Sequence, residues 1–302
     1  MLDPLSLLPF GLAARDGVLD GWPARQLVAA GVGVLRAHAP VARALARRRS
    51  AMLLPVGPSV LVALAASDGR GALFLDPATG PAQVARELNT ARVGAVFSTR
   101  SFANLLPDDL PRVLLDDAPA SATFVTAASR EQFDLSMHEG ISIEGDPDAE
   151  GSTEELLLAF DEAADPVSWS HRRAFGRVRA IVKTHGLRAI DRVLVMRASG
   201  DLHAFLDGEV SALAAGCRVT SLASTDIGRA LDEISRGNVT VLVAPGASLA
   251  AMSAHHEHSA AHAAGALRRT ILSTPANEAT RRAWAAWSGL EPAAIVALPS
   301  GA

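Results

Sequence analysis

Short apolar runs recur along most of this chain, and segments with helical periodicity separate them. The runs are nearly continuous in hydrophobic residues, which is typical of strands that are buried on both faces. Buried strands that alternate with helices indicate a mostly parallel sheet with helices on both sides. In the first half of the chain, the pattern predicts strands at 51–56, 72–77 and 94–99 and helices at 59–71 and 80–93.

A polar, acidic stretch at residues 139–155 interrupts the alternation, which then resumes. Such a stretch is typical of a domain boundary or a long surface loop. We therefore expect an α/β fold of two stacked αβα subdomains with mostly parallel sheets, formed by residues 1–150 and 151–302. The strands expected in the second subdomain are 155–160, 191–197, 217–222, 239–245, 267–274 and 294–300, and the helices are 169–186, 206–216, 224–237, 247–265 and 277–289.

Composition narrows the environment and the partners of the protein. Hydrophobic residues make up 49% of the chain, enough for a full core, and the net charge of −4 gives no positive field for nucleic acid or an anionic membrane. No apolar run approaches the roughly 18 residues that a membrane helix needs, and the start carries no basic leader. The single cysteine, Cys217, excludes an internal disulfide framework and is expected in the core. We expect a cytoplasmic protein.

A histidine-rich run, "HHEHSAAH", places His255, His258 and His262 at i, i+3 and i+7 on one face of a predicted helix. Three imidazoles on one face could hold zinc or nickel. A single helix separates positions i and i+7 by about 10 Å, however, and metal sites usually take ligands from more than one element. The alternative is a solvated face whose charge changes near neutral pH.

Four blocks of sequence follow one another in a recognisable order: 51–99 with "FLDP", 186–222 with "GLRAIDRVLVM", 232–252 with "VTVLVAPGASL" and 267–289 with "LRRTILSTP". This succession resembles the N-terminal domain of the adenylate-forming superfamily of AMP-dependent synthetases and ligases. That superfamily includes acyl-CoA synthetases, peptide-synthetase adenylation domains and luciferases. The resemblance implies the two-subdomain fold of that domain and an acid-thiol ligase-like ancestry.

One departure from the family lies in its phosphate loop. The family has a T-S-G-T-T-G-x-P-K loop, whose backbone amides, hydroxyls and lysine cradle phosphate, and the matching stretch here reads "DEAADPVSWSHRR". Two like charges about 4 Å apart at an effective dielectric near 20 repel by about 4 kcal/mol, so three carboxylates in this loop are expected to exclude ATP. The degenerate phosphate-loop region comprises Asp161, Glu162, Asp165, Pro166, Ser170 and His171.

Further departures concern magnesium and the catalytic lysine. The family's Y-G-x-T-E motif matches "LPSGA" at 298–302, which has neither the aromatic residue beside adenine nor the glutamate that holds Mg²⁺. The chain also ends before the family's β-barrel and C-terminal domain, and its only lysine, Lys183, matches neither family lysine. The resemblance therefore implies a truncated N-terminal domain with degenerate ATP motifs. No cofactor is expected, neither ATP nor Mg²⁺.

An acyl pocket is the remaining site that the resemblance implies. His203 in "SGDLHAF" matches the family's F-H-x-x-G histidine or aromatic residue, with a structural role as the alternative. In open α/β sheets, ligands bind at the carboxyl ends of strands, which points to the turns after two predicted strands. The expected pocket comprises His203, Pro245, Gly246, Ser273, Thr274 and Pro275.

Three functions stay open from the sequence. The first is a catalytically degenerate relative that binds an acyl or aryl acid, binds a carrier protein, or regulates an active homologue. The second is an active acyl-CoA or acyl-carrier-protein ligase that a separate partner chain completes. The third is an unrelated α/β protein that binds a small molecule, although no G-x-S-x-G or G-x-G-x-x-G motif supports another enzyme class. A homodimer is also possible.

Overall fold

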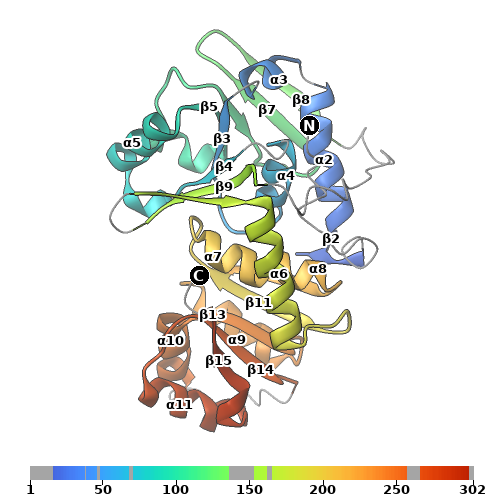
Figure 1. Cartoon of the computed structure of the whole chain (residues 1–302), viewed down its shortest axis with the longest axis vertical. Helices are drawn as coiled ribbons and strands as arrows, with labels where there is room; N and C mark the ends of the chain where they lie inside the picture. Colours follow the sequence, from blue (N-terminus) through green and yellow to red (C-terminus); the bar gives the residue numbers. More distant parts are fainter. Residues whose placement is uncertain are drawn as a thin grey trace.

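Two β-sheets organise the protein, one in each half of the elongated molecule (Figure 1). The computed structural model describes residues 16–37, 39–45, 48–67, 71–135, 153–161, 165–256 and 266–298. Helices lie on the outside of each sheet and between the two sheets, so the expected α/β fold with two mostly parallel sheets is confirmed.

The first sheet has eight strands in the order β10-β9-β4-β3-β5-β6-β7-β8. Its centre, from β9 to β6, is parallel, whereas β10 pairs with β9 and β7 with β6 and β8 in antiparallel fashion. The strands are β3 (Arg49–Leu53), β4 (Ala72–Phe74), β5 (Val93–Ser98), β6 (Arg112–Leu114), β7 (Ser121–Val125), β8 (Arg130–Asp134), β9 (Glu155–Phe160) and β10 (Pro166–Ser170).

The second sheet has seven strands in the order β15-β14-β13-β11-β12-β1-β2. All of its pairs are parallel except the short antiparallel pair of β1 and β2 at one edge. The strands are β1 (Val18–Leu19), β2 (Trp22–Pro23), β11 (Arg192–Arg197), β12 (Arg218–Ala223), β13 (Val241–Pro245), β14 (Arg269–Thr274) and β15 (Ile295–Ala297).

The helices form three layers, one between the sheets and one outside each of them. A single hydrophobic cluster joins the facing sides of both sheets through the middle layer, which includes α2 (Ala24–Ala37), α4 (Pro58–Ala66), α6 (His171–His185) and α8 (Ser211–Ala214). The remaining helices are α3 (Ala39–Leu45), α5 (Pro81–Ala91), α7 (Leu202–Ala204), α9 (Ile227–Ser235), α10 (Gly246–His256) and α11 (Glu278–Ser288), with a π-helical segment at Phe205–Val210 and 3-10 turns at Pro77–Thr79, Arg100–Leu105 and Pro292–Ala294.

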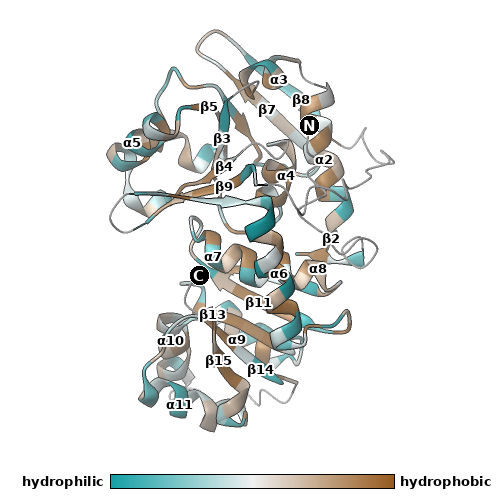
Figure 2. Ribbon diagram, in the orientation of Figure 1, coloured by the Kyte–Doolittle hydropathy of each residue, from teal (hydrophilic) through white to brown (hydrophobic). Residues whose placement is uncertain are grey.

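Hydropathy follows this layering. Figure 2 shows hydrophobic colour along β9, β11 and β15 and hydrophilic colour at the start of α6, where the chain leaves the hairpin. The second sheet has one face against α6 and α8, which we call the inner face, and one against α9, α10 and α11, the outer face. Inner-face residues are the odd-numbered ones of β11, such as Val193 and Val195, as period-two alternation requires.

Two expectations about local structure are corrected. The helix expected at 169–186 begins at His171, and residues 166–170 form β10, because they pair with β9 in a hairpin. The strands β6 to β8 and β1 to β2 were not expected. Each sheet thus takes strands from both sides of residue 150, and the division into residues 1–150 and 151–302 stays a prediction. Within the described ranges, no helix is both long and apolar enough to cross a membrane.

Candidate functional site

The carboxyl ends of the two sheets face each other across the middle of the molecule. The turn after β11 contains Gly200, and a Cβ atom there would lie 2.7 Å from Cβ of Asp76, which follows β4. The turn after β3 contains Gly57, where a Cβ atom would lie 3.6 Å from a carboxylate oxygen of Asp20, which follows β1. Loops after parallel strands of both sheets therefore meet, at the edge where open α/β sheets bind ligands.

The hairpin between β9 and β10 and the start of α6 contain the described residues of the predicted degenerate phosphate-loop region. The ends of the hairpin turn are closed by two short hydrogen bonds: the Asp161 amide donates to the Asp165 carbonyl at 3.0 Å, and the Asp165 amide donates to Asp161 Oδ1 at 2.9 Å. Asp161, Asp165 and Pro166 are exposed, whereas Glu162 lies outside the described residues. The Asp161 carboxylate therefore accepts from a backbone amide, that of Asp165, which is then not free to donate to a phosphate oxygen.

Ser170 and His171 form the junction between the hairpin and α6. Ser170 caps the helix, because its Oγ accepts a hydrogen bond from the Arg173 amide at 3.3 Å. The His171 ring is fully buried and lies edge-on to Phe175, with 5.9 Å between the ring centroids. These two members of the degenerate loop region therefore position the helix.

His203 lies beside the same hairpin. Its exposed ring makes an edge contact with the buried indole of Trp169 in β10, with 5.1 Å between centroids and an interplanar angle of 78°. The guanidinium of Arg173 covers the face of that indole at 4.1 Å. His203 therefore contacts the phosphate-loop hairpin through Trp169, a residue that the sequence patterns did not single out.

The other expected pocket residues meet at the ends of β13 and β14. A register shift after Ala244 leaves Ser273 as an extra residue in β14, because Pro245 pairs with Thr274. The Gly246 amide donates to Thr274 Oγ1 at 3.1 Å, and a Cβ on Gly246 would collide with the carbonyl oxygen of Pro275. Glycine is required there by this close approach. The structure thus brings together Pro245, Gly246, Ser273, Thr274 and Pro275.

Ser273 is the member of this group whose side chain has unused hydrogen-bonding capacity among the described residues. Its Oγ is buried and has no hydrogen-bond partner in the part of the chain that the structure describes. A bulge in a strand often redirects a side chain beside a functional site. A buried hydroxyl without a partner is unfavourable, so a ligand oxygen or nitrogen placed here would gain a hydrogen bond.

A buried ion cluster, defined as Asp20, Arg197, Glu209 and Ser221, lies at the carboxyl ends of β1, β11 and β12. Arg197 and Glu209 are both completely buried and pair at 2.8 Å from Nε to Oε1. The Arg197 guanidinium also donates to the carbonyls of Ala198 at 3.0 Å and Ser199 at 2.9 Å. Each of the three guanidinium nitrogens thus donates within the protein, and Arg197 holds the loop after β11 in place.

Asp20 is the fourth member of this cluster, and its burial changes its pKa. Its Oδ1 accepts a hydrogen bond from the Ser221 amide at 2.9 Å, and the Ser221 Oγ is buried without a partner among the described residues. Burial raises the pKa of Asp20 to about 6, and the nearby Glu209 carboxylate adds to that rise against the opposing Ser221 bond. No sequence motif indicated this cluster, because Asp20 lies far along the chain from its three other members.

The π-helical segment Phe205–Val210 carries two buried carboxylates. Asp207 makes a bidentate pair with Arg177 of α6, with both distances at 2.8 Å, while Glu209 pairs with Arg197 of β11. Gly208 packs against Val195, and a Cβ atom there would lie 2.7 Å from Cγ1 of that valine. The segment therefore ties the middle layer to the second sheet.

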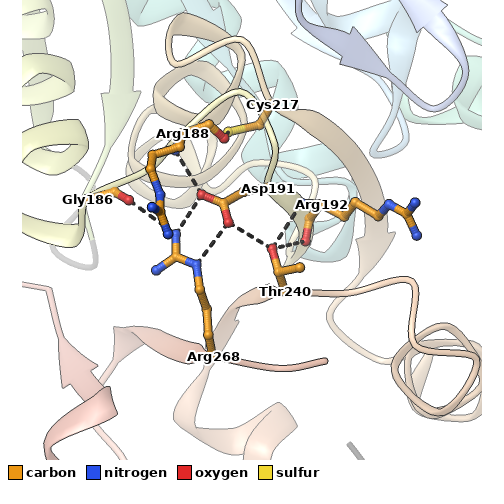
Figure 3. Close-up of polar contacts among 7 residues, drawn as sticks. All are labelled: Gly186, Arg188, Asp191, Arg192, Cys217, Thr240 and Arg268. Atoms are coloured by element: carbon orange, nitrogen blue, oxygen red, sulfur yellow. Dashed lines mark hydrogen bonds and ion pairs between the residues drawn. The ribbon is translucent and has the colours of Figure 1, made fainter. Parts of the chain in front are cut away.

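The opposite, amino end of the second sheet holds a second network (Figure 3). Asp191, just before β11, receives a bidentate pair from Arg268 at 2.9 and 2.6 Å and a hydrogen bond from Thr240 at 3.0 Å. Cys217 is buried beside it, and burial raises the pKa of its thiol to about 12. The expected core position of Cys217 is confirmed, and its thiol stays protonated and unreactive at neutral pH.

The expected histidine metal site is only partly covered. His255 is exposed on α10, while His258 and His262 lie outside the described residues. Within the described ranges, no group of three or more His, Cys, Asp or Glu side chains is arranged to hold a metal ion. The three-histidine site stays a prediction.

Comparison with known proteins identifies the class to which this fold belongs. No protein-family profile matches the sequence, and no curated protein matches it. Solved structures do match: the fold is that of the N-terminal part of adenylate-forming enzymes, as the sequence resemblance predicted.

Three of these structures give the extent of the likeness. The amide bond synthetase McbA from Marinactinospora thermotolerans superposes with a TM-score of 0.70 at 17% identity, over 97% of this chain and 59% of its own. The N-terminal domain of FACL13 from Mycobacterium tuberculosis gives 0.69 at 17% identity, over 91% and 68%. The adenylation domain of a keto acid-selecting peptide-synthetase module bound to keto acyl adenylate gives 0.68 at 12%, over 87% and 50%. The chain thus spans less than two thirds of McbA.

Proposed function

We propose that this chain is a non-adenylating protein that binds an acyl or aryl carboxylic acid on the adenylate-forming fold. The observation that carries the proposal is the pair of hydrogen bonds between Asp161 and Asp165, the last described residues on either side of the β9–β10 turn. The Asp165 amide donates to the Asp161 carboxylate at 2.9 Å, in the stretch that matches the family's phosphate loop. A backbone amide that already donates to a carboxylate within the chain is not available to a phosphate oxygen.

Asp161 and Asp165, the described residues on either side of the turn, do not fit Mg²⁺-ATP. Phosphate cradles need several free backbone amides and a cationic side chain. Here the Asp161 amide is also used internally, by the Asp165 carbonyl at 3.0 Å, and both side chains are exposed carboxylates. A triphosphate would have to break these bonds and lie against two negative charges. No step of the proposed function therefore passes through ATP.

The acid would bind at the ends of β13 and β14. Supporting this placement, the Ser273 Oγ is buried, has no partner among the described residues, and can donate to a carboxylate oxygen. Structures with this fold are described as complexes with acyl adenylate and with keto acyl adenylate. A carrier protein that presents the acid, or an active homologue that this chain regulates, belongs to the same proposal as a partner.

Calorimetric titration with Mg²⁺-ATP tests the first half of the proposal. The wild-type chain is expected to show no binding at millimolar ATP. The double variant Asp161→Asn/Asp165→Asn removes both exposed charges and is expected to bind ATP more tightly than wild type, although still weakly. Wild-type affinity in the micromolar range would overturn the proposal.

Titration with a panel of fatty, aryl and keto acids tests the second half. One class is expected to bind, and Ser273→Ala is expected to weaken it by about tenfold, the effect of one hydrogen bond to a charged group. Ser129→Ala, in an exposed turn of the first sheet, is the matched control. Pyrophosphate release with any acid, alone or with a second chain that supplies the rest of the enzyme, would replace this function by that of a two-chain ligase.

Location and assembly remain parts of the proposal. A single buried thiol, Cys217, is compatible with a reducing compartment, which supports a cytoplasmic location. Light scattering at several concentrations tests the possible homodimer, since a dimer would double the apparent mass.

A further inference from the structure

Two arginines stand side by side at the amino end of the second sheet. Arg192 is the first residue of β11, Arg218 is the first residue of β12, and the register pairs them directly in neighbouring parallel strands. Adjacent strands lie about 4.8 Å apart. Both side chains alternate with inner-face valines, so they project toward the outer face, on the side of α9.

Neither guanidinium has a charge partner among the residues that the structure describes. Both residues are exposed, and no hydrogen bond or ion pair joins either side chain to another residue in the described ranges. In Figure 3 the Arg192 side chain extends away from the Asp191 network with no contact drawn at its guanidinium. Like charges directly opposite each other in a sheet are unfavourable, so an isolated pair of this kind weakens the sheet unless an anion lies between them.

The backbone beneath this pair is held firmly. The Arg192 amide donates to Thr240 Oγ1 at 3.0 Å, and the Arg218 amide donates to the Asp191 carbonyl at 3.1 Å. Another arginine of this edge, Arg268, is already paired with the Asp191 carboxylate at 2.6 Å. The network in Figure 3 therefore neutralises Arg268 and holds the backbone from which the side chains of Arg192 and Arg218 extend.

A groove of about 320 Å³ lies over the two arginines. Such a volume is at the small end of the range of ligand sites. Besides Arg192, Val193 and Arg218, its walls include the Thr220 hydroxyl, the Asn238 amide and the Glu233 carboxylate. The last of these lies 3.5 Å from Arg236 on the same helix. Cations, a hydroxyl, an amide and one carboxylate thus converge on one small space.

We propose that this groove binds a phosphomonoester of a small hydroxylated molecule. Each guanidinium can donate two parallel hydrogen bonds to phosphate oxygens, and arginine is favoured wherever phosphate is bound by paired donors. Glu233 would repel a bare dianion but can accept a hydrogen bond from a ligand hydroxyl, and Asn238 can do the same or donate. The site lies at the amino end of the sheet, away from the acid site, and does not depend on the function proposed above.

Titration with glycerol 3-phosphate and with inorganic phosphate, at constant ionic strength in chloride, tests the proposal. Both are expected to bind the wild-type chain and to raise its melting temperature, glycerol 3-phosphate more tightly. Arg192→Gln and Arg218→Gln are each expected to lose at least tenfold in affinity. The matched control is Arg282→Gln, which replaces an exposed arginine of α11. It is expected to bind both ligands with the wild-type affinity.

Two further readouts separate a binding site from a general charge effect. In chloride alone, Arg192→Gln is expected to melt at or above the wild-type temperature, because it removes repulsion within the pair. Glu233→Gln is expected to reduce the preference for glycerol 3-phosphate over phosphate. No phosphate binding by wild type, or the same affinity in all three arginine variants, would overturn the proposal.

Discussion

The two edges of the second sheet treat charge in opposite ways. At the carboxyl edge, the Arg197–Glu209 pair is completely buried, and all three guanidinium nitrogens of Arg197 donate hydrogen bonds. Among the described residues, the side-chain groups without a partner there are neutral hydroxyls, those of Ser221 and Ser273. At the amino edge, the Asp191–Arg268 pair is partly exposed, and Arg192 and Arg218 beside it have no ion pair in the part of the chain that the structure describes. One edge therefore offers neutral hydroxyl donors to a ligand, and the other offers two cations.

The difference follows from burial. A charge that is removed from water is stable only when it is paired and hydrogen-bonded. The buried carboxyl edge therefore cannot hold an unpaired cation. The amino edge is open to solvent, where an unpaired guanidinium stays hydrated. The four predictions that follow test this contrast, from the largest expected effect to the smallest.

Glu209→Ala is expected to be the most disruptive change. It leaves the fully buried Arg197 without its carboxylate, and removing one partner of a buried pair costs about 3–5 kcal/mol. Urea unfolding measures the loss. The double variant Arg197→Met/Glu209→Leu, which removes both charges, is the control and is expected to recover most of it. A loss below about 1 kcal/mol in the single variant would show that water reaches this pair.

Asp191→Asn is expected to cost less, about 2 kcal/mol. It weakens the bidentate bond to Arg268, and the single oxygen of asparagine cannot accept from both the Thr240 hydroxyl and the Arg188 amide. Hydrogen bonds to charged groups contribute about 1.5–3 kcal/mol each. Because the Arg268 side chain is 30% exposed, solvent compensates for part of the loss. The same urea assay checks the order of the two effects. A cost equal to that of Glu209→Ala would remove the contrast between the edges.

Asp20→Asn is expected to stabilise the protein at neutral pH. The pKa of Asp20 is raised to about 6 in the fold, so its stabilising contribution is complete below its unfolded value near 3.8 and is lost as the pH rises through 6. Asparagine keeps the acceptor for the Ser221 amide without the charge. A gain of about 1–2 kcal/mol at pH 7 is expected after allowing for partial solvation. Identical unfolding curves at pH 4, 5, 6 and 7 for both proteins would contradict it.

His185→Leu is expected to have the smallest effect and the opposite dependence on pH. The ring is buried near the amino edge, neither ring nitrogen has a partner among the described residues, and burial, together with Arg269, lowers the pKa of His185. Its contribution is therefore present above the unfolded value near 6.5 and is lost as the pH falls through the lower folded value. The leucine variant should lose less stability than wild type between pH 7 and pH 5. A steeper loss in the variant would contradict this.

The sequence predicted the buried strands well because their signal is local. Predicted strands at 191–197 and 217–222 correspond to β11 and β12 within one residue at each end. The antiparallel strands were missed for a physical reason: β8 is exposed along nearly its whole length, so it has no apolar run. The two residues of β1 join the sheet only through their pairing with β12, about 200 positions further along the chain, which periodicity cannot show.

The sequence predicted those features of the candidate site that depend on residue type and on the order of the strands. The carboxylates at 161 and 165 could be read directly, and so could the meeting of the turns after two neighbouring parallel strands. The Ser273 hydroxyl, which has no partner among the described residues, owes its place to a register shift. The Arg192–Arg218 pair depends on which strands are neighbours. Both features depend on how the strands pair in the folded sheet, which local sequence does not determine.

The π-helical turn at Phe205–Val210 has a consequence for how this region tolerates length changes. A π turn holds one residue more than an α turn, so deleting one residue there would restore regular winding. The residues on either side would keep their helical phase, because the π turn absorbs the extra residue, but side chains inside the turn would change direction by about 100°, the angle between successive residues. Asp207 and Glu209 reach arginines on different elements, and both would turn away from them together. A one-residue deletion in this stretch is therefore expected to break both ion pairs at once, whereas a substitution of either carboxylate breaks only one.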